Sequence, residues 1–349
     1  MVKYIKACWK MLPDVSRSFA LAIKVLPKPL SEQMMVSYLI YRVIDTIEDS
    51  SAEKEVKKEM FENFIYILSQ KKIDVDEVHL CKLNLLEKIN YTYEKGLLEN
   101  LDAVAKVYYS MPEEVRGSIL KWGKVMAEGM YEFQRKRIDT FKDQDRYSYY
   151  VAGVVGYLFN DLLYHNKVIT LKTKKELHIY AKKFGLALQK VNILRDVASD
   201  IPSRRYFWPR KIMEKYRLDY DTLCKKENRK LAMKVLNEEI ENALEYLYSG
   251  MHYIISLPQN ALKVRMFCLI PLFMAIESYV KCINNTDVFD IEKKVKISRA
   301  QVHGIVAKCT LWGTSNERLV GWFLESVGKA NPKLAKGKKA VALLSMRNK

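Results

Sequence analysis

Strand-like alternation of apolar and polar residues is nearly absent from this 349-residue sequence. Apolar residues instead recur at helical spacing along most of the chain, which predicts an all-α fold. Hydrophobic residues make up 49% of the sequence, enough to bury a large core. No linker interrupts the pattern. We therefore expect a single helical domain over residues 1–330 and a lysine-rich tail over residues 331–349.

Cysteine is scarce and scattered. The six cysteines form no CxxC pair, so the sequence indicates neither a disulfide framework nor a cysteine-ligated zinc site. The five histidines show no metal-ligand spacing with one another or with the cysteines. These absences fit a reducing compartment, and we expect a cytoplasmic protein.

Long apolar runs are also missing. A membrane span needs roughly 18 continuous apolar residues, and the least charged stretches, 147–160 and 246–262, are broken by Gly, Pro, Ser or amide residues. The first ten residues lack the apolar segment of a signal peptide. We therefore expect a soluble protein, or one that is peripheral on the inner face of the membrane.

Acidic residues are the minority, with 41 Asp and Glu against 59 Lys and Arg, for a net charge of +18. Such a charge suits an anionic membrane, a polyanionic substrate or nucleic acid. The basic residues are spread out and no nucleic-acid signature is present, so we expect no nucleic-acid partner. The GxGxxG fingerprint of dinucleotide-binding folds is absent as well. We interpret most of the charge as a solvated surface and part of it as a contact for anionic lipid.

One stretch, residues 185–209, carries acid and amide groups where a buried helix should be apolar. Carboxylates four residues apart lie side by side on a helix, and their oxygens suit Mg²⁺. Acid pairs at this spacing are also common on solvated helix faces, so the pattern alone leaves both interpretations open. The residues on one stripe of this helix are Gly185, Gln189, Asn192, Asp196 and Asp200.

A second segment, residues 31–49, repeats the design. Its helix is largely apolar, yet one stripe carries a second aspartate pair. Facing the first stripe, it would form an acidic cradle that binds several divalent cations and, through them, a diphosphate. The stripe contains Tyr38, Arg42, Asp45 and Asp49, with Glu48 beside it.

These two motifs, DTIED at 45–49 and NILRDVASD at 192–200, resemble the paired aspartate-rich motifs of the squalene and phytoene synthase family. These are the head-to-head isoprenoid synthases, and their squalene synthase branch is the more similar. Three further segments resemble the family in the same order along the chain. They are SRSFALAI at 16–23, DRYSYYVAGVVG at 145–156 and FCLIPLFMAI at 267–276.

The resemblance implies a helical bundle around a central cavity, with two farnesyl diphosphates as substrates and Mg²⁺, or alternatively Mn²⁺, as the metal. Eukaryotic members generally end in a membrane anchor, so the resemblance also suggests an unanchored, prokaryotic form, which we expect to be a monomer. The implied metal ligands are Asp45, Glu48, Asp49, Asn192, Asp196 and Asp200.

The resemblance also implies substrate contacts. Arg17, Arg42, Arg195 and Arg205 would bind phosphate. Val151 and Val155 would line the apolar wall. The remaining expected substrate contacts are Ser16, Tyr38, Gln189 and Asn192.

Five residues are expected to be catalytic. Tyr147 would handle the proton lost when a cyclopropane closes, and the ring of Phe267 would face the carbocation. Arg42, Asp45 and Asp196 would act on the departing diphosphate. The structural alternative for Tyr147 is a buried tyrosine with a satisfied hydroxyl.

NADPH is expected from the resemblance alone. The segment VKISRAQV at 295–302 resembles the family's basic NADPH-contacting segment, with Lys296 and Arg299 as ligands, although a helix capped by Ser298 explains the same letters. Arg265 stands where the family usually has a second aromatic residue, which leaves the product open. The alternatives to squalene are presqualene diphosphate or a dehydrosqualene- or phytoene-type product made without reduction. A non-catalytic assembly factor is the remaining alternative, but its mark would be loss of the aspartates, and all four are present.

Overall fold

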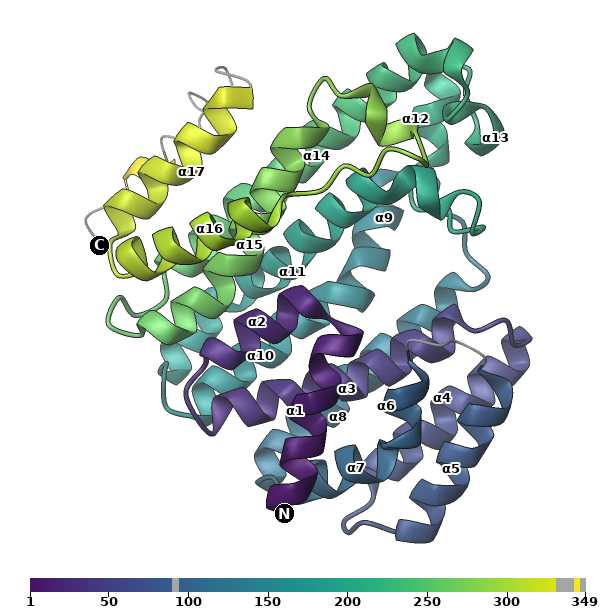
Figure 1. Ribbon diagram of the computed structural model, residues 1–349, viewed down its shortest axis with the longest axis vertical. Helices are drawn as coiled ribbons and strands as arrows, with labels where there is room; N and C mark the ends of the chain where they lie inside the picture. The colour runs from purple at the N-terminus through teal and green to yellow at the C-terminus, as the bar shows by residue number, and fades with distance from the viewer. Residues whose placement is uncertain (90–93, 331–341, 346–349) are drawn as a thin grey trace. The chain divides into compact units, whose positions relative to one another are not determined.

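The computed structural model describes residues 1–89, 94–330 and 342–345, and within those ranges every regular element is a helix (Figure 1). The all-α prediction is confirmed. The helices of the first half are α1 (Val2–Val15), α2 (Arg17–Val25), α3 (Leu30–Asp49), α4 (Lys54–Ser69), α5 (Val75–Lys88), α6 (Lys95–Glu99), α7 (Leu101–Tyr109), α8 (Glu113–Phe133), α9 (Phe141–Ser148), η1 (Tyr149–Gly153) and α10 (Val154–His165). Those of the second half are α11 (Leu171–Asp200), α12 (Arg210–Lys215), α13 (Tyr220–Leu223), η2 (Lys226–Asn228), α14 (Arg229–Ile255), α15 (Leu262–Cys282), η3 (Thr286–Phe289), α16 (Arg299–Trp312) and α17 (Asn316–Ala330).

The chain divides into two compact units. Unit 1 comprises Met1–Lys136 and Tyr157–Lys174, and unit 2 comprises Arg137–Gly156 and Lys175–Lys349. One boundary between the units falls between α8 and α9, and the other two fall inside α10 and α11. The expected single domain with a central cavity stays a prediction.

Helix α3 is the core of unit 1. It contacts α1, α2, α7 and α8 (Figure 1). Its apolar residues, among them Met35, Leu39, Val43 and Ile47, are completely buried. Each such side chain contributes about 1.5–3 kcal/mol through removal from water. The predicted buried helix is therefore present.

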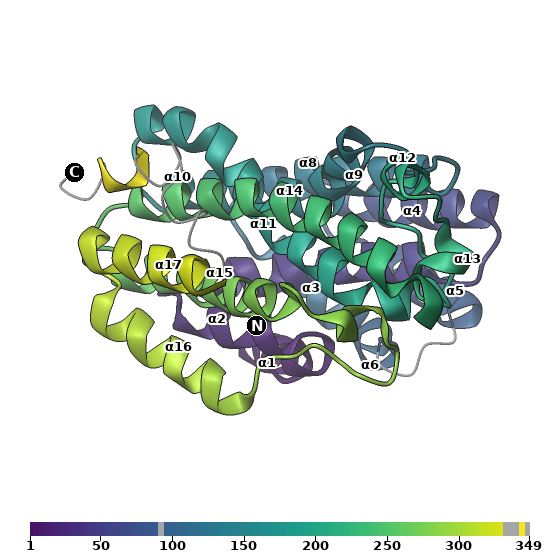
Figure 2. The same ribbon diagram turned by 90° about the horizontal axis from the view of Figure 1, so that it is seen from above.

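Helices α14 and α15 pack together in unit 2, and α16 and α17 lie beside α15 (Figure 2). Pro271 lies inside α15. The rings of Phe273 and Trp322 stack with centroids 3.4 Å apart and join α15 to α17.

Arg265 has a structural role at the end of α14. It is completely buried, and its guanidinium donates to the carbonyl of Leu257 at 3.0 Å and to Asn316 Oδ1 at 2.6 Å. Asn316 in turn donates to the carbonyl of Ile255, the last residue of α14. Burial lowers the pKa of Arg265 to about 10, so the group stays charged at neutral pH. The two oxygen acceptors and the nearby C-terminal end of α14, which carries a partial negative charge, stabilise the buried cation.

A π-helix interrupts the helical segment over residues 145–164. The segment is divided into α9, the π-helix η1 and α10. It packs very closely on α11: a Cβ added to Gly156 would lie 1.9 Å from the carbonyl oxygen of Ala181, and one added to Gly185 would lie 2.2 Å from that of Ala152. The small residues of this region therefore admit another helix rather than a substrate chain.

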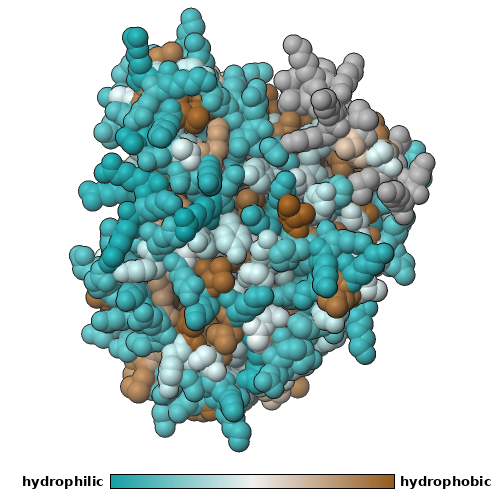
Figure 3. Space-filling view, turned by 180° about the vertical axis from the view of Figure 1, so that it is seen from behind, coloured by the Kyte–Doolittle hydropathy of each residue, from teal (hydrophilic) through white to brown (hydrophobic). Residues whose placement is uncertain are grey.

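Most of the predicted tail, residues 331–341 and 346–349, lies outside the described residues. Among the residues that are described, no helix is long and apolar enough to cross a membrane. On the face shown in Figure 3, hydrophilic side chains predominate and apolar ones form small separate patches.

Candidate functional site: two acidic helix stripes

The first candidate site feature is the α3 stripe, which we define as Tyr38, Arg42, Asp45, Glu48 and Asp49. Apart from Glu32 in the first turn, these are the only residues of α3 that are not buried. Asp49 is exposed and the other four are half-buried. A surface helix with incidental acids would expose a mixed polar face. Beyond its first turn, α3 is solvent-accessible only along its acidic stripe.

Arg42 connects this stripe to a carboxylate of α6's N-cap, Glu94. Arg42 Nη1 lies 3.6 Å from Asp45 Oδ2, while Nη2 lies 2.5 Å from Glu94 Oε1. Burial raises the pKa of Asp45 to about 7; the charge of Asp49 adds to this effect and that of Arg42 opposes it. A cation held between the two aspartates would therefore favour the ionised carboxylates. Sequence reasoning missed Glu94, because nothing in the local pattern links it to a helix that lies 52 residues earlier.

The α11 stripe, defined as Gln189, Asn192, Asp196 and Asp200, has a similar setting. Asn192 is exposed, Gln189 and Asp196 are half-buried, and Asp200 is buried. The rest of this half of α11 is largely buried, including Leu186, Val191, Ile193, Leu194 and Val197.

Each aspartate of the α11 stripe is paired with an arginine. Arg195 donates two hydrogen bonds to Asp196, from Nε to Oδ1 at 2.8 Å and from Nη2 to Oδ2 at 2.5 Å. Arg205 Nη2 lies 3.0 Å from Asp200 Oδ1. These are two of the arginines expected to bind phosphate. Forked guanidinium groups bind carboxylate and phosphate with the same geometry, so their present partners are compatible with that role.

Each stripe meets the expected requirements of a metal site only in part. Among the described residues, no three His, Cys, Asp or Glu side chains gather in a way that could hold a metal ion. Each stripe does offer two carboxylates one helical turn apart, the hard oxygen donors that Mg²⁺ and Mn²⁺ accept. The two stripes belong to different units, and their meeting at one metal cluster stays a prediction.

Lys57 closes the end of α3 next to the acidic stripe, which sequence reasoning did not foresee. The side chain is 7% exposed, and Nζ donates to the carbonyl of Glu48 at 2.6 Å and to Gln134 Oε1 at 3.2 Å. Burial lowers its pKa, while the charges of Glu48 and Asp49 oppose that shift. An ammonium group at a helix C-terminus satisfies an unpaired carbonyl and favours the helix dipole.

We expect Lys57→Met to lower the free energy of unfolding by about 1–2 kcal/mol, because a buried carbonyl loses its donor. Urea unfolding followed by circular dichroism measures the change. Lys58→Met is the matched control, since Lys58 is 49% exposed and its ion pair with Glu62 spans 3.7 Å. Equal stability of the two variants would show that Lys57 does not cap α3.

Some of the residues near the N-terminus that were predicted to contact the substrate have structural roles. Ser16 caps α2 by accepting a hydrogen bond from the backbone N–H of Phe19 at 3.2 Å. Tyr38 stacks on the ring of Phe19 with centroids 5.6 Å apart. The side chain of Arg17 lies outside the described part of the chain. Substrate binding by these residues stays a prediction.

Tyr147 is buried, with 6% of its surface exposed, and its ring stacks on Phe207 with centroids 4.8 Å apart. Phe267 is buried on α15, and Val151 and Val155 are half-buried. Their catalytic and substrate-contacting roles stay predictions.

The π-helix after Tyr147 was not predicted. It contains Tyr149 and Tyr150, both half-buried, which sequence reasoning passed over. π-helices are frequent at functional sites, and the signal was visible only in the backbone.

The predicted NADPH segment is explained locally by a helix cap. Ser298 Oγ accepts from the N–H of Gln301, and Gln301 Oε1 accepts from the N–H of Ser298, which forms a capping box. Lys296 and Arg299 are exposed. Their contact with NADPH stays a prediction.

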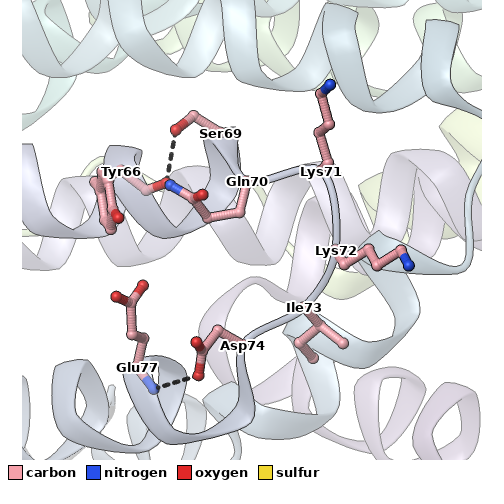
Figure 4. Close-up of a pocket in the computed structure, with 8 residues that line it drawn as sticks. All are labelled: Tyr66, Ser69, Gln70, Lys71, Lys72, Ile73, Asp74 and Glu77. Carbon is pink, nitrogen blue, oxygen red and sulfur yellow. Dashed lines mark hydrogen bonds between the residues drawn. The ribbon is translucent and has the colours of Figure 1, made fainter.

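A surface pocket between α4 and α5 carries no comparable chemistry (Figure 4). Its one capping aspartate, Asp74, accepts hydrogen bonds from the N–H groups of Asp76 and Glu77 at 3.1 Å, which begins α5. The lining residues are Tyr66, Ser69, Gln70, Lys71, Lys72, Ile73, Asp74 and Glu77.

Known proteins resemble the chain over most of its length. A family model described as squalene/phytoene synthase matches residues 12–301. The squalene synthase of Schizosaccharomyces pombe is 32% identical over 85% of this chain, and that of Rattus norvegicus is 32% identical over 88%. The matched regions span 63% and 70% of those relatives' own lengths.

Solved structures agree in fold. A ligand complex of TcSQS aligns with a TM-score of 0.84 at 27% identity, covering 99% of this chain and 96% of that one. A dehydrosqualene synthase aligns with a TM-score of 0.64 at 19% identity, covering 89% of this chain and 96% of that one, which supports the fold alone.

Proposed function

Because this chain belongs to the squalene/phytoene synthase family, we propose that it joins two farnesyl diphosphates head to head and reduces the product to squalene. The family makes it a prenyltransferase-type enzyme of isoprenoid biosynthesis, and the reduction is the finer part of the proposal. The observation that carries the proposal is the exposure pattern of α3 and α11. Helix α3 and the C-terminal half of α11 are largely buried, and each carries a half-buried aspartate among its predicted ligands, Asp45 and Asp196.

The aspartates of the two stripes would hold the metal ions. Asp45 and Asp49 supply one carboxylate pair, and Asp196 and Asp200 supply the other. Glu48 and Asn192 add oxygen donors beside them. Bound Mg²⁺ would offset the negative charge that develops on the departing diphosphate.

The arginines would bind the phosphate oxygens. Arg42 and Arg195 already lie beside the carboxylates of their stripes, and Arg205 lies beside Asp200. Forked guanidinium groups can bind phosphate as readily as carboxylate, so these side chains suit the positioning of the leaving group. Arg17 with Ser16, together with Tyr38 and Gln189, would complete the substrate contacts.

The apolar residues would protect the allylic cation from water. Val151 and Val155 would form part of the wall, and the ring of Phe267 would stabilise the cation by about 0.5–2 kcal/mol. The alkene of the second substrate attacks the cation, and loss of a proton closes a cyclopropane. We assign that proton to Tyr147, with the released diphosphate as the alternative base.

The second half of the reaction needs a reductant. After a second ionisation and rearrangement, NADPH would supply hydride, and Lys296 and Arg299 would bind its phosphates. Both basic side chains are exposed, which suits a dissociable cofactor.

We expect Tyr147→Phe to lower product formation by about 100-fold or more, because general acid–base groups contribute about 10²–10⁴. Farnesyl diphosphate should still bind, since the ring and its stack on Phe207 remain. Steady-state kinetics and calorimetric binding separate the two effects. An unchanged rate would move the proton-handling role to another group.

The activity is tested by incubating purified protein with farnesyl diphosphate and Mg²⁺, with and without NADPH. We expect squalene only when NADPH is present and presqualene diphosphate when it is absent. Dehydrosqualene or phytoene-type products would favour the branch without reduction. No consumption of substrate under either condition would overturn the proposal.

We further propose a cytoplasmic monomer that meets the inner face of the membrane through anionic lipid. The support is the net charge of +18 and the apolar character of the substrate. Co-sedimentation with phosphatidylglycerol vesicles, against phosphatidylcholine vesicles as a control, tests the lipid contact.

A further inference from the structure

Unit 2 contains a buried polar network that the proposed reaction does not use. Gln144 of α9, Lys190 of α11 and Glu239 of α14 are 0%, 1% and 2% exposed. Burying a lysine and a carboxylate is costly unless each has partners. The network therefore needs an explanation.

Gln144 is its central member. Gln144 Nε2 donates to the backbone carbonyl of Phe207 at 3.0 Å and to the two carboxylate oxygens of Glu239 at 3.0 and 3.2 Å. Gln144 Oε1 accepts from Lys190 Nζ at 2.7 Å. An ammonium group can only donate, so Lys190 fixes the orientation of the amide, with its oxygen toward Lys190 and its NH₂ group toward Glu239 and Phe207.

The ammonium group of Lys190 also fixes the next residue of α9, Asp145. Its Nζ lies 2.5 Å from Asp145 Oδ1 and donates to Asn242. The hydroxyl of Tyr246 donates to Asp145 Oδ2 at 2.5 Å. Two consecutive residues of α9 are thus held by α11 and α14.

Stability alone does not account for this arrangement. Glu239 and Asp145 bring two negative charges against the single charge of Lys190. Burial raises the pKa of Glu239 to about 7, although Lys190 and Gln144 oppose the shift. Apolar residues of similar volume would stabilise such a core about as well, or by about 1–4 kcal/mol more. What an apolar core would not supply is a fixed direction for each hydrogen bond.

The network leads directly to Tyr147. Phe207, whose carbonyl is held by Gln144, stacks its ring on Tyr147 with an interplanar angle of 21°. The next residue, Trp208, donates from its indole N–H to the carbonyl of Ile193 in α11 at 3.0 Å. The backbone of Phe207 is therefore fixed by the hydrogen bond to its own carbonyl and by the hydrogen bond of Trp208. Its ring is held in a fixed position against the ring of Tyr147.

We propose that Gln144 is a positioning residue for Tyr147 and acts through Phe207. This inference rests on the proposed function only for its effect on the reaction rate. Without the Gln144 amide, the carbonyl of Phe207 loses its donor and the ring loses its fixed place. A displacement of about 1 Å at a reacting group costs about 10²-fold in rate.

The test compares Gln144→Met with Tyr246→Phe. The first keeps the side-chain length but removes both hydrogen-bonding groups. The second removes a network hydrogen bond on the side away from Phe207. In each variant, kcat and KM for farnesyl diphosphate are measured. Tyr147 is also replaced by 3-fluorotyrosine, and its ¹⁹F resonance reports the ring stack without any turnover.

We expect Gln144→Met to lower kcat by about 10- to 100-fold with KM changed by less than about twofold, and to move the ¹⁹F resonance. Tyr246→Phe should leave kcat and the resonance near those of the parent protein. If Gln144→Met does not fold, Phe207→Leu must give the same loss of kcat with the network intact.

An unmoved resonance and unchanged kcat in Gln144→Met would overturn the inference. So would an equal loss of kcat in Tyr246→Phe, because that result means a merely structural network. If the parent protein does not consume farnesyl diphosphate, the proposed function fails, and the ¹⁹F resonance alone decides whether Gln144 positions Tyr147.

Discussion

Replacing Asp45 or Asp196 by asparagine is expected to lower squalene formation by about three orders of magnitude, because each variant removes a carboxylate that we propose binds metal. The two residues lie on α3 and α11, in different units. Equal losses in the two variants would indicate that the stripes act on the same substrate group. Rates are measured with saturating farnesyl diphosphate, Mg²⁺ and NADPH.

Stability separates this effect from unfolding. The folded-state pKa of Asp45 is raised above its ordinary value, so the ionised carboxyl destabilises the metal-free protein at pH values above that ordinary value. Asp45→Asn removes the charge and should unfold at an equal or higher urea concentration at pH 8. Asp76→Asn, at an exposed position of α5, is the activity control. Normal turnover in Asp45→Asn or Asp196→Asn would contradict the metal role.

Gly156→Ala is expected to lower the free energy of unfolding by about 3 kcal/mol or more, because the new methyl group overlaps the backbone of α11. Its Cβ would lie 1.9 Å from the carbonyl oxygen of Ala181, and a backbone atom cannot move aside as a flexible side chain can. The start of α10 would separate from α11. We expect lower activity as well, because α11 carries Asp196 and Asp200.

Gly117→Ala is a control of opposite sign. Gly117 lies inside α8, and a Cβ there would meet nothing within 4 Å. Alanine should therefore stabilise the helix by about 0.5–1 kcal/mol. Thermal and urea unfolding of both variants measure the difference. A Gly156→Ala protein as stable as Gly117→Ala would show that the two backbones are not in close contact.

The sequence allowed the acidic stripes to be predicted because they depend on helical periodicity alone. Asp45 and Asp49 fall on the open face of α3, and the apolar residues around them are buried as the pattern indicated. The family motifs then supplied the chemistry. The same local reasoning explains why Ser298 was recognised as a helix cap.

Other parts of the site depend on contacts between distant residues. Glu94 pairs with Arg42 across 52 positions, and Gln144 reaches Glu239 across 95. No periodicity encodes such pairs. In the sequence, Lys57 cannot be distinguished from the many surface lysines. Only the packing of α4 beside the end of α3 shows that it is buried.

The π-helix was missed for a different reason. The residues around Tyr149 are compatible with an ordinary α-helix, and the additional residue in the turn is visible only in the backbone. Arg265 differs from the family pattern, and it binds the carbonyl of Leu257, just beyond the end of α14, and Asn316, which sequence reasoning could not separate from a change in the substrate cavity.

The most direct test of the central claim is calorimetric binding of farnesyl S-thiolodiphosphate, an analogue that ionises very slowly, with and without Mg²⁺. The account predicts tight binding only with Mg²⁺, and loss of that Mg²⁺-dependent binding in both Asp45→Asn and Asp196→Asn. Binding that is independent of Mg²⁺, or that survives either substitution, would contradict the proposal that the two acidic helix stripes jointly hold the diphosphate through metal.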